Sequence, residues 1–135
     1  MRTTFLLSNM CPQKQGLNGG QWARLEGAAH ALARSHGQVW IFTGPAFASS
    51  ASTRTIGPNQ VAVPSHFFKV ILCVHADGTK EMFAYIMPNV EKPEGNFRAF
   101  NNTVSFLQDL TGLDFFSALP DDEEQELERS ALQIP

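Results

Sequence analysis

The feature that most constrains this chain is a pair of long β-strand patterns joined by a two-residue turn signal. Residues 66–89, HFFKVILCVHADGTKEMFAYIMPN, hold two apolar runs rich in β-branched and aromatic residues, and Asp77-Gly78 separates them. Asp-Gly between two such runs is among the strongest short-range signals for a β-hairpin. The pattern therefore predicts two antiparallel strands at the centre of the fold.

Two shorter segments also have strand character. Residues 3–9 (TTFLLSN) and 38–44 (QVWIFTG) are apolar runs, and the second is expected to stop at the Gly-Pro pair that follows. Residues 48–60 are small and polar, and residues 91–102 are rich in charge, Pro and Gly, so both are predicted to be loops.

Helical periodicity is clearest in residues 21–37, where Gly37 is well placed to end the helix. The expected apolar stripe consists of Trp22, Leu25, Ala29, Leu32 and Ala33. Thr103 is predicted to cap a short helix through Leu110, and Asp121-Asp122 to cap an acidic helix at about residues 120–132. Together these patterns predict one mixed α+β domain over residues 1–135, built on an antiparallel sheet.

Length and composition fit a globular domain. The 135 residues are 43% hydrophobic and 17% charged, and a chain of this length buries roughly two thirds of its unfolded surface. No apolar run approaches the roughly 20 residues that a membrane span needs, and no charged-then-apolar leader opens the sequence. The sequence thus predicts no membrane contact, and either a cytoplasmic protein or a natural N-terminus upstream of Met1.

Charge is distributed unevenly along the chain. Residues 121–128 hold six of the thirteen acids, whereas residues 1–120 carry nine Lys/Arg against seven Asp/Glu, a net of +2. This balance neither demands nor excludes a polyanionic partner. The two cysteines, Cys11 and Cys73, form no CxxC pair, so they make no zinc site by themselves, and nothing in the sequence supports a disulfide between them.

The segment that opens the predicted helix carries candidate chemistry. In SNMCPQKQGLNGGQWARLE (residues 8–26), Asn18, Trp22 and Glu26 follow one another at steps of four, and His30 comes next. A step of four advances about 40° around an α-helix, so these residues are expected to share one face. Two plainer interpretations remain open: Asn18 is a turn residue before glycine, and Glu26 is a solvated carboxylate that pairs with His30.

Other candidate sites are weaker. Gly19-Gly20 is no nucleotide loop, because no Lys-Ser/Thr follows it. The four histidines lack metal-ligand spacing, and His66 and His75 are expected to lie half buried and hydrogen-bonded at strand positions.

The same opening segment resembles the signature of the DNA/RNA non-specific endonuclease family, the endonuclease G-like ββα-metal (His-Me finger) nucleases. The segments 39–47, 63–72, 83–89 and 110–116 resemble later family segments in the right order. The resemblance implies a ββα-metal nuclease fold. It also implies Mg²⁺-dependent endonucleolytic cleavage of DNA and RNA through their phosphate backbones, without sequence preference.

The resemblance also implies roles for particular residues. Asn18 would be the one protein ligand of Mg²⁺, with Mn²⁺ as a substitute, and Glu26 would act on the ion through water. Asn9 would orient the site. His30 and Arg24 would contact substrate phosphate, with His30 at a position where relatives often carry arginine.

One expected element is absent from the printed sequence. The family's general base is a histidine in an Asp-Arg-Gly-His motif upstream of residues 3–9, and none of the four histidines lies there. Loss of a general base typically costs about 10²–10⁴-fold in rate. The resemblance therefore indicates an N-terminally truncated, inactive or impaired nuclease. The alternatives are a catalytically dead metal- or nucleic-acid-binding remnant, and one chain of a split nuclease whose N-terminal half is a separate partner. Family members are often secreted or periplasmic.

Overall fold

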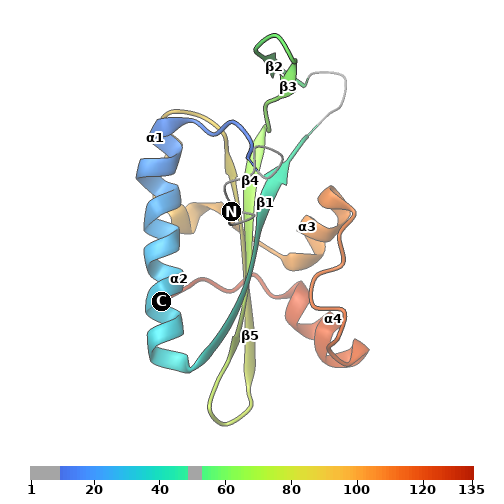
Figure 1. The fold of residues 1–135 in the computed structure, drawn as a ribbon. Coiled ribbons are helices and arrows are strands. Elements are labelled where there is room, and N and C mark those ends of the chain that lie inside the picture. Colours follow the sequence, from blue (N-terminus) through green and yellow to red (C-terminus); the bar gives the residue numbers. More distant parts are fainter. Residues whose placement is uncertain (1–9, 49–52) are drawn as a thin grey trace, which may run out of the picture.

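The computed structural model describes residues 10–48 and 53–135. Its main sheet is antiparallel, with the strand order β1-β4-β5-β6. The strands are β1 (Gln38–Ala46), β4 (His66–Val74), β5 (Lys80–Pro88) and β6 (Asn101–Asn102). Figure 1 shows helix α2 on one side of this sheet and helices α3 and α4 on the other. The predicted α+β class with an antiparallel sheet is confirmed, while the strand predicted at residues 3–9 lies outside the described residues.

The central hairpin forms as predicted. β4 and β5 pair from His66↔Pro88 to Val74↔Lys80, and Gly78 takes the positive φ of 86° that the turn requires. The Asp77 carboxylate accepts hydrogen bonds from the Thr79 backbone N–H (3.0 Å) and hydroxyl (2.6 Å). These bonds lower the pKa of Asp77, with the Thr79 hydroxyl as the largest cause.

The helix at the start of the described chain begins earlier than the predicted residue 21. It consists of α1 (Gln15–Leu17), a five-residue π-helical segment (Asn18–Trp22) and α2 (Ala23–His36). Gly37, with φ at 89°, ends it as expected. Trp22, Leu25, Ala29 and Leu32 are buried as predicted, but Ala33 is exposed, because each step of four carries the side chain further around the helix.

β1 continues past the Gly-Pro pair where it was expected to stop. Among the described residues, β1 pairs with β4 alone. An edge strand tolerates Pro45, because the missing N–H would point away from the ladder. Gly44 fits here for a second reason, since a Cβ on it would lie 2.9 Å from the Phe68 ring.

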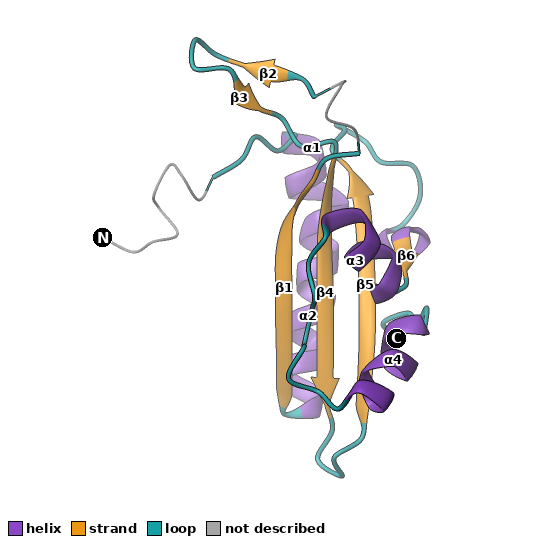
Figure 2. Cartoon of the chain, turned by 90° about the vertical axis from the view of Figure 1, so that its right-hand side faces the viewer, coloured by secondary structure: helices purple, strands orange, loops and turns teal. Residues whose placement is uncertain are grey.

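Both predicted loops contain short regular elements. Within residues 53–62, β2 (Thr55–Ile56) pairs with β3 (Val61–Ala62), and Figure 2 shows this small hairpin beyond the end of the main sheet. A 3₁₀-helix (Phe97–Phe100) and β6 interrupt the second loop. Neither segment had apolar alternation long enough to signal these elements.

The two C-terminal helices are close to their predicted positions. α3 spans Val104–Thr111, and the Thr103 hydroxyl accepts a hydrogen bond from the Phe106 N–H at 3.1 Å, which confirms the predicted cap. α4 spans Asp121–Arg129 and follows Pro120. Asp121 and Asp122 therefore lie in its first turn rather than at its cap, where their charge still suits the helix N-terminus.

The sheet separates two hydrophobic clusters. Alternate residues of β4 face opposite sides of a strand, so Phe67 and Ile71 pack toward α2, whereas Phe68 and Val70 pack toward α3 and α4. The end of the chain returns to the α2 side, where the backbone N–H of buried Ile134 donates to the Tyr85 hydroxyl at 2.9 Å (Figure 1).

Two further sequence predictions can be compared with the structure. Cys11 and Cys73 are free thiols, so they form no disulfide. None of the helices in residues 10–48 and 53–135 combines the length and apolar character that crossing a bilayer takes.

Candidate active site

Asn18 lies at the first position of the π-helical segment, with an exposed side chain. Its backbone N–H donates to the Lys14 carbonyl at 3.0 Å, and this bond connects Asn18 to the preceding helical turn, α1. Gly20, with φ −105° and ψ −113°, interrupts the helical backbone two residues later. A Cβ on Gly19 or Gly20 would meet nothing within 4 Å, so the surface beside Asn18 is open. π-helical distortions of this kind are frequent at functional sites.

Three predicted site residues follow on α2 with exposed side chains: Arg24, Glu26 and His30. Glu26 lies in the first turn of α2, where a carboxylate is favourable. Trp22 does not share the exposed face of Glu26 and His30 as expected, because it is buried with 4% exposure. Each α-helical step of four advances about 40°, and this drift carries Glu26 and His30 away from the buried stripe to which Trp22 belongs. Asn9 lies outside the described residues.

The start of the site helix is fastened by a residue whose role the sequence did not reveal. Asn89 follows β5, and its Oδ1 accepts the Lys14 backbone N–H at 2.8 Å. Its Nδ2 donates to the carbonyl oxygens of Pro12 and Pro64, both at 3.0 Å. The amide thus fixes the segment that leads to Asn18 against the end of the sheet. The segment FAYIMPN supported the family resemblance, but no spacing rule connects Asn89 with residue 14.

A second contact holds the same segment. The Gly16 N–H donates to Glu91 Oε2 at 2.9 Å, and Lys14 Nζ lies 3.9 Å from Glu91 Oε1. A Cβ on Gly16 would lie 2.0 Å from the Glu91 carbonyl oxygen. The backbone approaches too closely there for any residue but glycine.

A buried lysine lies between the sheet and the site helix. Lys69 on β4 is 5% exposed, and its Nζ donates to the Thr43 hydroxyl at 2.6 Å. The same Nζ lies 4.8 Å from the centre of the Trp22 ring, a cation–π contact. Burial lowers the pKa of Lys69, and the negative charge of Glu26 partly opposes that shift. No pattern in the sequence predicts this contact, because a lone lysine in an apolar strand pattern is usually exposed.

Both histidines that were predicted at strand positions contact a polar neighbour as expected, but only His66 lies within a strand. His66 is half buried, its Nδ1 lies 2.9 Å from the Ser65 hydroxyl, and burial lowers its pKa. His75 directly follows β4, and its Nε2 lies 2.7 Å from Glu81 Oε2.

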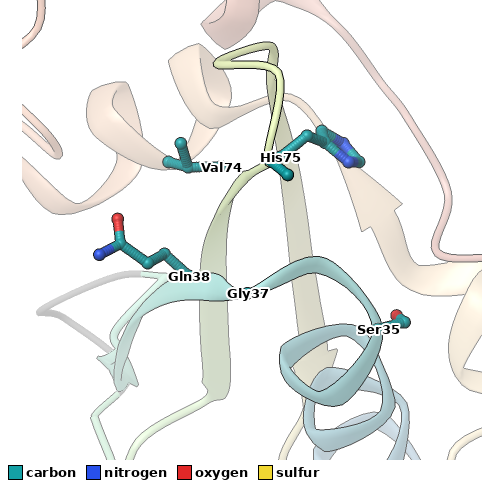
Figure 3. Close-up of a pocket in the computed structure, with 6 residues that line it drawn as sticks. Ser35, Gly37, Gln38, Val74 and His75 are labelled. Atoms are coloured by element: carbon teal, nitrogen blue, oxygen red, sulfur yellow. The ribbon is translucent and has the colours of Figure 1, made fainter.

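Two cavities in the described part of the chain have neither Asn18, Glu26 nor His30 in their lining. A cavity of about 620 Å³ lies at the C-terminal end of α2, away from Asn18, and is lined by Ser35, Gly37, Gln38, Val74, His75 and Ala76. Figure 3 shows the His75 ring pointing away from Gln38, so the polar groups there do not converge on one point. A smaller cavity, about 200 Å³, lies beside the segment before Asn18 and has Lys14, Arg54 and Asn89 in its lining.

Comparison with known proteins decides the family. Residues 1–122 match the DNA/RNA non-specific endonuclease family. The chain belongs to this family. The family prediction made from the opening segment is therefore confirmed.

Individual nucleases are similar in sequence or structure to this chain. Human mitochondrial endonuclease G is 41% identical over 102 residues, which cover 70% of this chain and 34% of that protein. Nuclease C1 of Cunninghamella echinulata var. echinulata is 36% identical over 131 residues, which cover 88% of this chain and 51% of that protein. The crystal structure of the EndoG/EndoGI complex matches with a TM-score of 0.79 and 33% identity, over 89% of this chain and 53% of that one.

The chain thus spans between a third and about half of the length of these relatives. The match to the EndoG chain includes the antiparallel sheet and its helices, so the ββα-metal nuclease fold is shared.

Proposed function

We propose that this chain carries the metal-binding part of an endonuclease site that hydrolyses DNA and RNA with Mg²⁺. The observation that carries the proposal is the exposed amide of Asn18 in a π-helical segment, followed on the same helix by the exposed carboxylate of Glu26. Membership of the DNA/RNA non-specific endonuclease family supports it.

The donor set fits a hard divalent cation. Mg²⁺ prefers oxygen ligands and keeps most of its water, so one amide oxygen from Asn18 with a nearby carboxylate, Glu26, is sufficient. The open surface beside Gly19 and Gly20 leaves room for that water and for a phosphate group. When bound, the ion supplies Lewis-acid stabilisation of charge on the phosphate and the leaving oxygen. Mn²⁺ has the same preference for oxygen ligands and would substitute.

The other residues of the site act on substrate and solvent. Glu26 accepts hydrogen bonds from water beside Asn18 and holds that water in place. Arg24 and His30 are exposed on α2 and offer donors to the phosphate backbone of DNA or RNA. Asn9 orients the segment before the helix. Phosphate contacts carry no base information, which accounts for cleavage without sequence preference.

The general base in this proposal comes from an Asp-Arg-Gly-His segment, which the printed sequence does not contain. A feature of the structure suits the docking of such a segment. Trp40, Ile41 and Phe42 on the edge strand β1 are 59%, 43% and 45% exposed. Exposed apolar edge strands readily accept another strand. A separate N-terminal partner chain, as in a split nuclease, would dock here equally well.

A catalytically dead remnant is the second candidate, in which Asn18 and Glu26 bind a metal ion or nucleic acid without cleavage. Genomic DNA upstream of Met1 separates the two. An in-frame Asp-Arg-Gly-His directly upstream supports the enzyme, whereas a stop codon there supports the remnant.

Reconstitution tests the proposal directly. The chain alone should degrade plasmid DNA with Mg²⁺ slowly or not at all, and adding the upstream segment, fused or as a separate peptide, should restore cleavage. Asn18→Ala should then abolish metal-dependent cleavage. Asn59→Ala, in the exposed turn between β2 and β3, is the matched control and should cleave like the parent. Unchanged cleavage by Asn18→Ala would show that the metal ligand is another residue.

A further inference from the structure

Three carboxylates meet on the face of the sheet opposite the candidate active site. They are Asp114, in the loop after α3, and Glu124 and Glu128, one turn apart on α4. One ligand oxygen from each lies within 4.8 Å of the others. Figure 1 shows α4 and α2 on opposite sides of the sheet, so this cluster and Asn18 are separate places in the fold.

Glu128 is the unusual member of this cluster. It is only 7% exposed, and its Oε1 has no hydrogen-bond partner among the described residues. Oε1 of Glu124 is also buried without a partner in that part of the chain. The Gln108 side chain on α3 favours the charged form of Glu128, but burial and the charge of Glu124 oppose it more strongly, so the pKa of Glu128 is raised.

Within residues 10–48 and 53–135, no lysine, arginine or histidine forms an ion pair with any of the three acids. The neighbouring acid differs, since Glu123 pairs with Lys80 at 2.6 Å. Lys80 therefore pairs with Glu123 and with none of the three acids of the cluster.

Buried carboxylates in proteins are paired with a cation or coordinate a metal ion. Burial is the largest cause that raises the pKa values of Glu124 and Glu128, and the charges of the neighbouring acids raise them further. A bound divalent cation would offset both effects, because its charge stabilises the ionised carboxylates. Three carboxylates from two elements offer up to six oxygens in an adaptable arrangement, which suits Ca²⁺ better than the strict octahedron of Mg²⁺.

We propose that Asp114, Glu124 and Glu128 bind one Ca²⁺ ion, which fastens α4 to the loop after α3. Asp114 also borders an open cavity of about 410 Å³, which gives an ion access from solvent. The site is structural and does not depend on the nuclease function proposed above.

The test is thermal unfolding of the whole 135-residue chain with EDTA and then with CaCl₂. About 5 mM CaCl₂ exceeds the dissociation constants of even weak protein calcium sites. A ligand that binds only the folded state raises the midpoint temperature of unfolding. We expect Ca²⁺ to raise this temperature by about 3–6 °C, with saturation at high concentration. Calorimetric titration should show one Ca²⁺ per chain.

Glu128→Gln should lose this increase. The variant stays informative because it removes a buried charge, so in EDTA it should be at least as stable as the parent. Glu126→Gln is the matched control, because it makes the same charge change on the same helix at an exposed position outside the cluster. It should keep the full response to Ca²⁺.

Two results would overturn the proposal. The first is that CaCl₂ does not change the midpoint temperature of the parent chain, or raises it equally in Glu126→Gln and Glu128→Gln. The other is loss of the response in Asn18→Ala, which would place the ion at the opposite face. An unchanged Ca²⁺ response in Asn18→Ala supports the proposal, whatever the outcome of the nuclease assays.

Discussion

The side-chain oxygen of Asn89 accepts the backbone N–H of Lys14 at 2.8 Å, across 75 residues of sequence. The same amide donates to the carbonyls of Pro12 and Pro64. One side chain at the end of β5 therefore satisfies three backbone groups of two loops. The position of Asn18 depends on this connection, because Asn18 begins its segment four residues after Lys14 and donates its own N–H there.

Replacing Asn89 with alanine should loosen the segment before Asn18. Backbone groups in a half-buried place would lose their partners, at a cost of about 1–3 kcal/mol in the free energy of unfolding. Chemical denaturation measures that loss. Hydrogen exchange should also accelerate at the backbone amides of Lys14 and Asn18.

Asn59→Ala serves as the control, because Asn59 is exposed in the turn between β2 and β3. Its free energy of unfolding should change by less than about 0.5 kcal/mol. Equal exchange at Lys14 in Asn89→Ala and in the parent would mean that Gly16 and Glu91 hold the segment without Asn89.

A pair of glycine substitutions should have opposite effects. In Gly16→Ala the new Cβ would lie 2.0 Å from the Glu91 carbonyl oxygen, so the backbone must move, and we expect a loss of about 1–3 kcal/mol. In Gly27→Ala the Cβ meets nothing within 4 Å on α2, and the helix should gain about 0.5–1 kcal/mol. Urea midpoints of the two variants check both signs. A neutral Gly16→Ala would contradict the close approach to Glu91.

The sequence predicted the elements that short-range patterns govern. Asp77-Gly78 fixed the hairpin because Gly78 alone had to adopt a positive φ, and Thr103 fixed the start of α3 through a bond within one turn. The resemblance to the family predicted roles for Asn18 and Glu26 because its signature spans one continuous segment, and those roles remain predictions. Each of these inferences needed only neighbours along the chain.

The features that the sequence missed depend on distant residues. The segment that leads to Asn18 is anchored by Asn89 and Glu91, which lie about 75 residues away in the sequence. The buried position of Lys69 depends on its contacts with Trp22, at the end of the π-helical segment, and with Thr43 on β1. Periodicity within one element carries no information on such contacts.

The acidic cluster on α4 should make stability depend on pH in a defined direction. Burial and the charges of Glu124 and Asp114 raise the pKa of Glu128 above 4.5 in the folded state. Between pH 4.5 and that raised value the folded state holds more protons than the unfolded state, so the free energy of unfolding falls as pH rises. Glu124, which also faces Asp121, contributes in the same direction.

Glu128→Gln should remove part of that dependence. In EDTA, its stability relative to the parent should increase as pH rises from about 4.5 to 7. Denaturant unfolding at several pH values measures the difference. A difference that is constant with pH, or the same as for Glu126→Gln, would mean that Glu128 has an ordinary pKa.

The pKa of Lys69 should depend on the charge of Glu26 on α2. Glu26 raises the pKa of Lys69 against the larger effect of burial, so Glu26→Gln should lower that pKa further. A titration of the Lys69 side chain followed by NMR measures the change. Glu81→Gln at the far end of the hairpin is the control. Equal pKa values of Lys69 in all three proteins would show that Glu26 and Lys69 are not electrostatically coupled.

The last prediction concerns His30, exposed one turn after Glu26 on α2. A guanidinium stays charged at any working pH and contacts phosphate through two parallel hydrogen bonds, whereas imidazole loses its charge between about pH 6 and 7 and offers single contacts. If His30 contacts substrate phosphate, His30→Arg in the reconstituted enzyme should raise the cleavage rate at pH 8 more than at pH 6. Ala31→Arg, also exposed on α2 but 100° further around it, controls for the added charge. A rate ratio between variant and parent that stays flat from pH 6 to pH 8 would exclude His30 as a phosphate contact, and so would an equal gain from Ala31→Arg.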